Sequence, residues 1–440
     1  MDNKIITIDG GHLTINHIYR LVSDLGVSIE VPDSNFRILN NSVNFLEKEI
    51  GRKKIIYGVN TGFGPMATHI INHGQLSALQ ENLIRSHAAG AGDAIKPEYV
   101  LASMAVRLNT LVKGYSGVSP DLIKILVKFI NLRIIPVIPE HGAVGTSGDL
   151  VQLAHIALAL IGEGEVFYKG KRQPTATVLK QLQIRPYKLR PKEGLALING
   201  TSVMAGIAAL LCVEADRLIS AAVRLGALAL EQVRGFDDSI SEKLHELRPH
   251  RGQILIAKAL RKILADSRMI RSRDDFQKNH ETLDEVHKIT EEVQQVYSLR
   301  CIPQILGPVL DTLSKVRKDV ETEINSVTDN PIVYYQEKKF LHGGNFHGDY
   351  IAAAIDQLKM TLVKLTMLSE RQINFFLNDK VNRIFPPFMN LNKPGLTLAL
   401  QGLNFVATST TAQSQTLAFP HYVHSIPTNA DNQDLVSMGT

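Results

Sequence analysis

The chain carries apolar residues at three- and four-residue spacing over unusually long stretches, and this pattern limits the folds open to it. The longest stretch runs from Thr201 to roughly Val233. Further long helices are predicted over residues 281–297, 308–327 and 349–377, and shorter ones over 75–89, 98–112 and 121–131. Ser119 and Pro120 open the last of these as N-cap and first helical residue. We therefore expect a mainly α-helical protein in which long helices form a central bundle.

The remaining fold is expected to be simple, because only residues 165–172 have the pattern of a small β-hairpin. The sequence contains no internal repeat and no low-complexity segment. We expect an N-terminal helical domain over residues 1–200, which includes the hairpin. A central domain of long helices should follow over residues 201–440.

Composition excludes several classes of protein. Hydrophobic residues make up 44% of the 440 residues and charged residues 21%, a balance typical of soluble globular proteins. The net charge of +5 comes from basic residues interspersed with acidic ones, which argues against nucleic-acid binding. The longest apolar run, Val203 to Val213, is too short to span a bilayer. With two cysteines and no signal-like N-terminus, we expect a cytoplasmic protein that binds neither membrane nor nucleic acid.

The hexapeptide Gly145-Thr146-Ser147-Gly148-Asp149-Leu150 is chemically unusual. Gly148 lacks a Cβ, so the backbone can fold tightly and bring the Gly148 nitrogen onto the Thr146 carbonyl. Ring closure followed by loss of water from Ser147 would turn plain backbone into an electrophile. A simpler interpretation is a glycine-flanked loop in which Asp149 caps the next helix. A serine-hydrolase nucleophile fits poorly, because its motif places one residue between the serine and the second glycine.

Five further segments place polar residues in loops between the predicted helices. Their candidate residues are Tyr57 and Gly64, then Asn199, then Gln294, Tyr297 and Arg300, then Asn345 and Phe346, and last Asn432 and Gln433. Taken singly, each segment is explained by turn chemistry, a helix cap or a solvated arginine. The sequence has no usual metal-ligand spacing, phosphate-binding glycine loop or complete dinucleotide fingerprint, so no metal site is expected.

Together with the Thr-Ser-Gly step, these segments give the chain a specific resemblance. From about Gly51 to Thr440 it resembles the aromatic amino acid lyases, a family of histidine, phenylalanine and tyrosine ammonia-lyases and related aminomutases. The resemblance implies the long-helix bundle of that family. It also implies that Thr146-Ser147-Gly148, in the N-terminal domain, cyclises to 4-methylideneimidazol-5-one (MIO), with no external cofactor. Most members have alanine at the position of Thr146, and this departure blurs the choice between lyase and mutase.

The family chemistry assigns roles to the loop residues. An amino-acid ammonium leaves poorly, and bonding the substrate amine to MIO makes it able to depart. The resemblance gives removal of the β-proton to Tyr57, with Tyr297 as the alternative base, and the substrate carboxylate to Arg300. It implies a polar lining that orients the substrate, formed by Gly64, Asn199, Gln294, Tyr297, Asn345, Asn432 and Gln433, with Phe346 as an apolar wall.

Two signals disagree about which aromatic amino acid is used. Ser86-His87 matches the pair of histidine ammonia-lyases, whereas Gln433 stands where those enzymes carry glutamate. Residues 298–310 and 342–350 look most like bacterial tyrosine ammonia-lyases that also carry Ser-His. Because a neutral His87 can hydrogen-bond a phenol, we expect L-tyrosine to be converted to trans-p-coumarate and ammonia. A histidine ammonia-lyase forming urocanate and an aromatic 2,3-aminomutase are the alternatives.

Assembly is a further expectation. The apolar faces of the long helices exceed what one chain is expected to cover, and the resemblance implies a homotetramer whose active sites each share loops from three chains. We therefore expect Tyr57, Asn199 and Arg300 around one site to come from more than one subunit. The sequence stops at Thr440 inside a motif that family members continue, so the bundle is expected to lack C-terminal helices. A non-catalytic helical assembly protein is the remaining alternative, against which the intact Tyr57, Ser147 and Arg300 argue.

Overall fold

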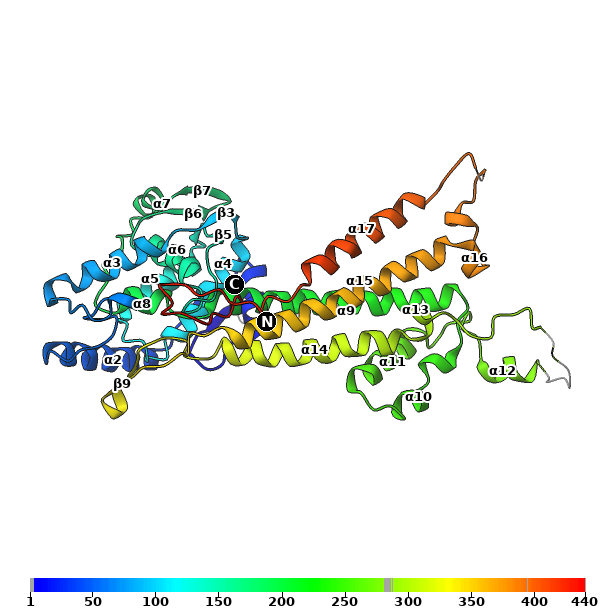
Figure 1. The fold of residues 1–440 in the computed structure, drawn as a ribbon, viewed down its shortest axis with the longest axis horizontal. Coiled ribbons are helices and arrows are strands. Elements are labelled where there is room, and N and C mark those ends of the chain that lie inside the picture. Colours follow the sequence, from blue (N-terminus) through cyan, green and yellow to red (C-terminus); the bar gives the residue numbers. More distant parts are fainter. Residues whose placement is uncertain (1–3, 281–285, 287, 394, 440) are drawn as a thin grey trace. The chain divides into compact units, whose positions relative to one another are not determined.

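The computed structural model describes residues 4–439 apart from 281–285, 287 and 394. The structure is mainly helical, which confirms the expected fold class (Figure 1). The chain divides into two compact units. Unit 1 comprises Met1–Val213, Arg317–Ile355 and His421–Thr440, and unit 2 comprises Glu214–Val316 and Asp356–Pro420. Unit 1 thus combines the first part of the sequence with two later segments.

Unit 1 contains most of the shorter helices and the start of the longest one. Its helices are α1 (Ile15–Ser23), α2 (Asp33–Gly51), α3 (Leu76–His87), α4 (Pro97–Leu111), α5 (Pro120–Asn131), α6 (Leu150–Leu160), α7 (Thr175–Gln181) and α8 (Glu193–Ile198). The predicted cap of α5 is confirmed, because the Ser119 side chain accepts the Leu122 N–H and Pro120 follows it. The long helix α9 (Ser202–Gln232) begins directly after the Asn199-Gly200 turn.

Short strands are more numerous than the sequence suggested. The expected hairpin forms from β6 (Glu165–Tyr168) and β7 (Lys171–Pro174), and β4 (Ile135–Pro136) pairs with β6. The expectation of a single hairpin is wrong, however, because three other two-stranded pairs occur. They are β1 (Ile5–Thr7) with β2 (Ser28–Glu30), β3 (Ala91–Ala94) with β5 (Pro139–His141), and β8 (Ile332–Tyr334) with β9 (Lys339–Leu341). Strands of two to four residues are too short to show an alternating pattern.

Unit 2 is built from long helices and short connecting ones. α9 continues into it, and so do α14 (Ile302–Glu323) and α15 (Asp349–Leu377), whose bounds are split between the units. The others are α10 (Glu242–Glu246), α11 (Arg251–Ile263), α12 (Arg273–Lys278), α13 (Tyr297–Arg300), α16 (Asp379–Asn382) and α17 (Gln401–Leu417). α15 begins and ends at the residues that the sequence predicted, 349 and 377.

Two helix predictions need correction. The helix expected over residues 281–297 falls partly outside the described residues, and residues 288–296 form no helix. Val293 in that segment is 48% exposed, so its apolar spacing has no core to face, and short helices without packing are marginal. The helix predicted from Pro308 begins earlier, at Ile302, and contains Pro308 in its interior. The preference of proline for the first turn of a helix misplaced that boundary.

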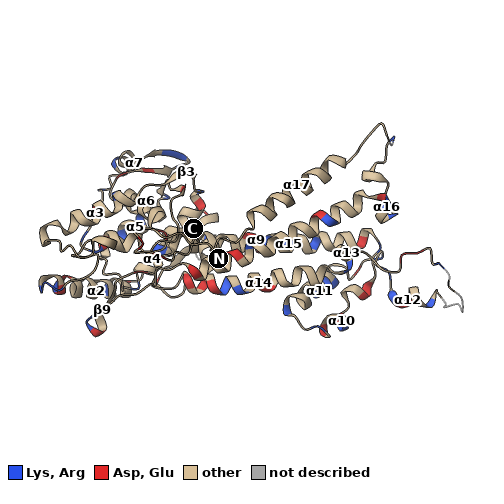
Figure 2. Ribbon diagram, viewed as in Figure 1, with Lys and Arg blue, Asp and Glu red and all other residues tan. Residues whose placement is uncertain are grey.

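Charge is spread rather than gathered. Lys and Arg are interspersed with Asp and Glu over the helices (Figure 2). Among the helices in the described part of the chain, none combines the length and apolar character that crossing a membrane requires.

Candidate active site

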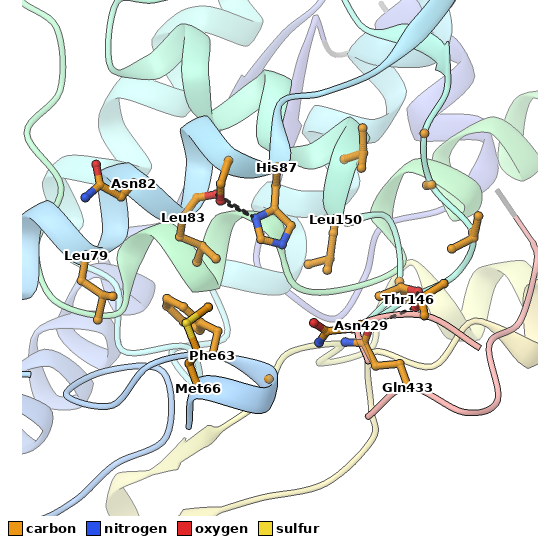
Figure 3. Close-up of a pocket in the computed structure, with 18 residues that line it drawn as sticks. Phe63, Met66, Leu79, Asn82, Leu83, His87, Thr146, Leu150, Asn429 and Gln433 are labelled. Atoms are coloured by element: carbon orange, nitrogen blue, oxygen red, sulfur yellow. Dashed lines mark hydrogen bonds between the residues drawn. The ribbon is translucent and has the colours of Figure 1, made fainter. Parts of the chain in front are cut away.

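A cavity in unit 1 brings together candidate residues that lie far apart in the sequence. It holds about 530 Å³, and its lining includes Phe63, Gly64, Ser86, His87, Thr146, Gly148, Thr428, Asn429 and Gln433. Thr146, Asn429 and Gln433 gather at one end, Leu79, Leu83 and Phe63 lie toward the other, and His87 lies between them (Figure 3). None of the described residues that line it is Asp, Glu, Lys or Arg. The cavity is therefore neutral and largely apolar.

The backbone of the tripeptide is tightly turned. Ser147 and Gly148 both have positive φ, 49° and 79°, a conformation that glycine tolerates and serine rarely adopts. A Cβ on Gly148 would lie 2.2 Å from the Gly200 carbonyl oxygen and 3.0 Å from that of Phe346. Gly200 in turn donates its N–H to the Ser147 carbonyl oxygen at 3.2 Å. This position therefore requires glycine, and the turn is held by the start of the next segment.

Asp149 does not act as the simple cap that its position suggested. It precedes α6, but its side chain makes no capping hydrogen bond there. Its Oδ2 instead accepts the N–H groups of Val203 at 2.7 Å and Met204 at 3.0 Å, at the N-terminus of α9. The carboxylate is fully buried and favourably placed at the positive end of that helix. Asp149 therefore ties the tripeptide to α9.

Four buried charged residues lie near the tripeptide within unit 1, and we call them the charged layer: Arg107, Asp149, Lys192 and Asp329. Each is at most 1% exposed. Lys192 Nζ lies 2.6 Å from Asp329 Oδ2, and Arg107 Nη2 donates to the Ala196 carbonyl. Burial lowers the pKa of Arg107 to about 10, while attraction to Asp329 and Asp149 opposes that shift. A Cβ on Gly200 would lie 2.6 Å from Arg107 Nη1, so this layer packs directly behind Gly200.

The loop that carries Tyr57 is anchored by hydrophobic packing on both sides of that residue. Ile56 and Val59 are fully buried in a cluster with Leu46, Ile50 and Leu76, so Tyr57 between them is half-buried and fixed in place. The Tyr57 hydroxyl oxygen accepts the Gly64 N–H at 3.1 Å, and Gly64 lines the cavity. A backbone donor on this oxygen would stabilise the negative charge of a phenolate. The loop thus holds the Tyr57 phenol against Gly64, which lines the cavity, although Tyr57 itself is not one of the lining residues.

Ser86 and His87 end helix α3 at the cavity. His87 Nδ1 lies 2.9 Å from the Leu83 carbonyl oxygen and 3.0 Å from Ser86 Oγ. A carbonyl can only accept, so Nδ1 is the donor in this contact, and in the neutral imidazole Nε2 then carries the lone pair. Ser86 Oγ also donates to the Leu83 carbonyl at 2.9 Å. His87 can therefore accept a hydrogen bond through Nε2.

The segment near residue 430 contributes more than the sequence indicated. Gln433 Nε2 donates to Ser147 Oγ at 3.3 Å, and Thr428 Oγ1 lies 2.8 Å from Thr146 Oγ1. Sequence reasoning named Asn432 and Gln433 but missed Thr428 and Asn429, which line the cavity. Asn432 itself is exposed and donates its backbone N–H to Asn429 O. Thr428 stands just outside the recognised motif, so no local signal pointed to it.

The other unit 1 candidates are close to the tripeptide but not in the cavity lining. Asn199 is buried, and its Oδ1 has no hydrogen-bond partner among the described residues. Phe346 approaches Gly148 through its carbonyl oxygen rather than its ring. Asn345 is exposed and donates to the Val327 carbonyl at 3.2 Å. Phe63 and Met66, which the sequence argument passed over, supply apolar wall instead.

Three candidates lie in unit 2, where they line a pocket of that unit. Tyr297 is 69% exposed, and Gln294 is also exposed. The Arg300 guanidinium lies 4.7 Å from the Tyr297 ring centroid, and its buried Nε has no partner among the described residues. The Arg300 guanidinium therefore keeps one buried donor, Nε, that no described residue binds.

The residues fit the cyclised group that the sequence implied. Gly148 has no room for a side chain, and the Ser147 carbonyl has a backbone donor. The orphaned Asn199 Oδ1 does not bear on this fit, because it is an acceptor and the cyclised ring has no N–H or O–H to donate. Across the described residues, no group of three or more His, Cys, Asp or Glu side chains could hold a metal ion.

Comparison with known proteins gives a consistent result. A sequence model of the aromatic amino acid lyase family matches residues 13–440. Histidine ammonia-lyase of Bacillus subtilis (strain 168) is 39% identical over 436 residues, which are 99% of this chain and 82% of that protein. Tyrosine 2,3-aminomutase of Chondromyces crocatus is 43% identical over 389 residues, 88% of this chain and 73% of that one. The crystal structure of tyrosine aminomutase from Streptomyces globisporus is similar with a TM-score of 0.94 and 38% identity, covering 99% and 82% of the two chains.

Proposed function

Because this chain belongs to the aromatic amino acid lyase family, a family of carbon–nitrogen lyases, we propose that it deaminates an aromatic L-amino acid without oxidation. The proposed substrate is L-tyrosine and the products are trans-p-coumarate and ammonia. The observation that carries this proposal is the single cavity lined by residues of the Tyr57 loop, Ser86-His87, the tripeptide and Gln433. The reaction breaks the bond from Cα to nitrogen and removes one proton from Cβ.

We propose that Thr146, Ser147 and Gly148 supply the electrophile as MIO. The Gly148 nitrogen would bond to the Thr146 carbonyl carbon, whose oxygen leaves as water with the hydrogens of the Gly148 and Ser147 nitrogens. A second water takes the Ser147 hydroxyl and its Cα hydrogen, so the step needs no oxidant. MIO supplies an electrophilic carbon for the substrate amine. The tight turn at Ser147 and Gly148 supports this chemistry, because it folds the backbone back on itself.

The residues around the cavity then divide the remaining work. Tyr57 takes the β-proton, and the Gly64 N–H on its oxygen favours the phenolate that does so. The Gly200 N–H, backed by Arg107, donates to the Ser147 carbonyl oxygen, where it would favour electron density moving toward that atom. The apolar residues Phe63, Leu79 and Leu83 exclude water from the aromatic ring.

The neutral cavity supports tyrosine over histidine. Nδ1 of His87 is already engaged, so Nε2 is left to accept the phenol hydroxyl of tyrosine. Gln433 adds no negative charge that would favour an imidazolium ring. The histidine alternative rests on Ser86-His87 and on the 39% identity to a histidine ammonia-lyase. The aminomutase alternative rests on Thr146 and on the 43% identity to a tyrosine 2,3-aminomutase.

We also propose that Arg300, Gln294 and Tyr297 serve the site from other copies of the chain in a homotetramer. The cavity lining described in unit 1 has no cation for a substrate carboxylate, whereas Arg300 can bind one in a bidentate pair. Leu218, Leu225 and Leu228 of α9 are each at least 50% exposed, and α17 buries none of its residues. Such apolar helix faces support assembly.

An absorbance assay tests the reaction. Purified protein is mixed with tyrosine, phenylalanine or histidine, and the three unsaturated products are distinguished by their ultraviolet spectra. We expect p-coumarate to form fastest, with equimolar ammonia. Formation of urocanate would favour the histidine alternative, and a β-amino acid of unchanged mass would favour the mutase. No product from any of the three would overturn the proposed function.

Subunit mixing tests the shared site. Ser147→Ala and Arg300→Ala proteins, each inactive alone, should recover activity after subunit exchange, because some sites would then collect both intact residues. Recovery should be absent when Ser147→Ala is mixed with Tyr57→Phe, because Tyr57 is hydrogen-bonded to Gly64, which lines the same unit 1 cavity as Thr146 and Gly148. Proven exchange without recovery in the first mixture would contradict shared sites.

A further inference from the structure

We propose that Thr146 and Thr428 are positioning residues that hold the Gln433 amide on the Ser147 hydroxyl while the tripeptide cyclises. This inference rests on the proposed function, since it concerns how the electrophile forms. Its basis is a chain of hydrogen bonds that leaves the tripeptide at Thr146 and returns to it at Ser147. No residue outside unit 1 takes part.

The direction of this chain follows from the donors available. Thr428 Oγ1 donates to Gln433 Oε1 at 3.3 Å and has only one hydrogen. It must therefore accept from Thr146 Oγ1, which lies 2.8 Å away. With its oxygen held by Thr428, the Gln433 amide directs Nε2 to Ser147 Oγ at 3.3 Å. Every donor in the circuit is used once, so removal of either threonine hydroxyl breaks it.

The loop that carries Gln433 needs this support. Thr428 and Gln433 pair through their backbones, with Thr428 N donating to Gln433 O at 3.1 Å. Between them, Asn429, Ala430 and Asp431 all have positive φ, at 56°, 51° and 57°. Three such residues in a row are strained, and strain of this kind persists only where surrounding contacts enforce it. The Thr146 hydroxyl is the side chain that fastens Thr428, at one end of this loop, to the tripeptide.

The chemistry explains why Gln433 should face Ser147. Loss of the second water breaks the bond from Cβ to Oγ of Ser147, and a hydroxyl leaves poorly. A donor on Oγ stabilises the negative charge that develops there as the bond breaks. The Gln433 amide donates to Ser147 Oγ, which is the atom that departs in this step. An alanine at position 146 would have no hydroxyl to hydrogen-bond Thr428. This bond is therefore a specific role for the threonine that this chain carries there.

The experiment follows dehydration directly rather than turnover. The chain is made by cell-free synthesis, quenched in denaturant at intervals and weighed intact. Thr428→Val should lose water about three- to tenfold more slowly than wild type, the effect expected for one neutral hydrogen bond. Thr428→Ser, which keeps the hydroxyl, should restore the wild-type rate. Thr416→Val is the matched control, because that hydroxyl bonds only the Ala412 carbonyl on the exposed face of α17.

Three more variants keep the test decisive. Gln433→Leu should slow dehydration at least as much, and adding Thr428→Val to it should have no further effect if both act through one circuit. Thr146→Ala combined with Thr428→Val should likewise be no slower than Thr428→Val alone. Equal time courses for Thr428→Val and wild type, with matching thermal unfolding midpoints, would overturn the inference. A wild-type chain that neither loses water nor turns over an amino acid would overturn the proposed function instead.

Discussion

The two sides of the Thr146–Gly148 tripeptide differ in charge although both belong to unit 1. Behind it, the charged layer packs two cations and two anions that are at most 1% exposed. In front, the cavity is lined, through all its described residues, without Asp, Glu, Lys or Arg. Buried charges are stable only when paired and hydrogen-bonded, as Lys192 is with Asp329 and Asp149 is with the start of α9.

The difference in charge indicates that the two sides of the tripeptide have different roles. The charged layer holds the backbone that we propose to cyclise, through Gly200 and the N-terminus of α9, and none of its charges lines the cavity. None of the described residues that line the neutral cavity is Lys or Arg, which is why we propose that Arg300 binds the substrate carboxylate. Substitutions on the two sides should therefore change different properties of the protein.

The largest effect should come from Ser147→Ala, between the two sides. Without the Ser147 hydroxyl no second water can leave, so the electrophile cannot form and kcat/KM should fall by several orders of magnitude. Stability should change little, because Ser147 is half-buried. Steady-state kinetics with a thermal unfolding scan would check both. Retained turnover would mean that the reaction does not depend on this residue.

On the cavity side, Tyr57→Phe keeps the ring and removes the proton acceptor. We expect kcat to fall by about 10²–10⁴-fold with KM mostly retained, since the phenol acts in the transition state. Lys54→Met, in the same loop, is a control that should leave kcat unchanged, because the Lys54 ammonium lies 3.6 Å from Glu49 Oε2 and has no proposed part in the reaction. Near-normal kcat in Tyr57→Phe would assign the proton to another residue, with Tyr297 the first candidate.

On the charged side, Asp329→Asn should act on stability. It leaves Lys192 as a buried cation without its carboxylate, which should lower the free energy of unfolding by about 3–5 kcal/mol. The matched control is Glu337→Gln, which breaks an exposed pair with Lys339 and should change it by less than about 1 kcal/mol. Urea titrations of both proteins give the comparison. Equal midpoints for the two variants would show that the charged layer does not stabilise the fold.

The smallest expected effect concerns substrate choice. His87→Phe should shift the tyrosine-to-phenylalanine ratio of kcat/KM toward phenylalanine, by the equivalent of about 1–3 kcal/mol for a phenol left unpaired. Ser86→Ala should leave the ratio unchanged, because the Leu83 carbonyl still fixes His87 Nδ1. A ratio that stays constant in His87→Phe would show that His87 does not read the ring substituent.

The sequence predicted the elements better than the contacts between them. Helices such as residues 349–377 were predictable because their apolar periodicity is long. The role of the tripeptide, which rests on an unusual order of common residues, stays a prediction. The cross-link from Asp149 to α9, the pairing of Lys192 with Asp329 and the bond from Thr146 to Thr428 join residues far apart in the chain. Local periodicity carries no information about such pairs, and a threonine or a lysine has many ordinary roles on a surface.

The central claim is that residues 146–148 become the electrophile, and peptide mapping by mass spectrometry tests it most directly. A sample that is first shown to turn over tyrosine is digested, and the mass of the fragment that contains Thr146-Ser147-Gly148 is measured. The same fragment of Ser147→Ala is the control. We predict that the wild-type fragment is lighter than its sequence by about 36 Da, the mass of two waters lost in a covalent modification of the chain. An active enzyme whose fragment has the unmodified mass would contradict the account.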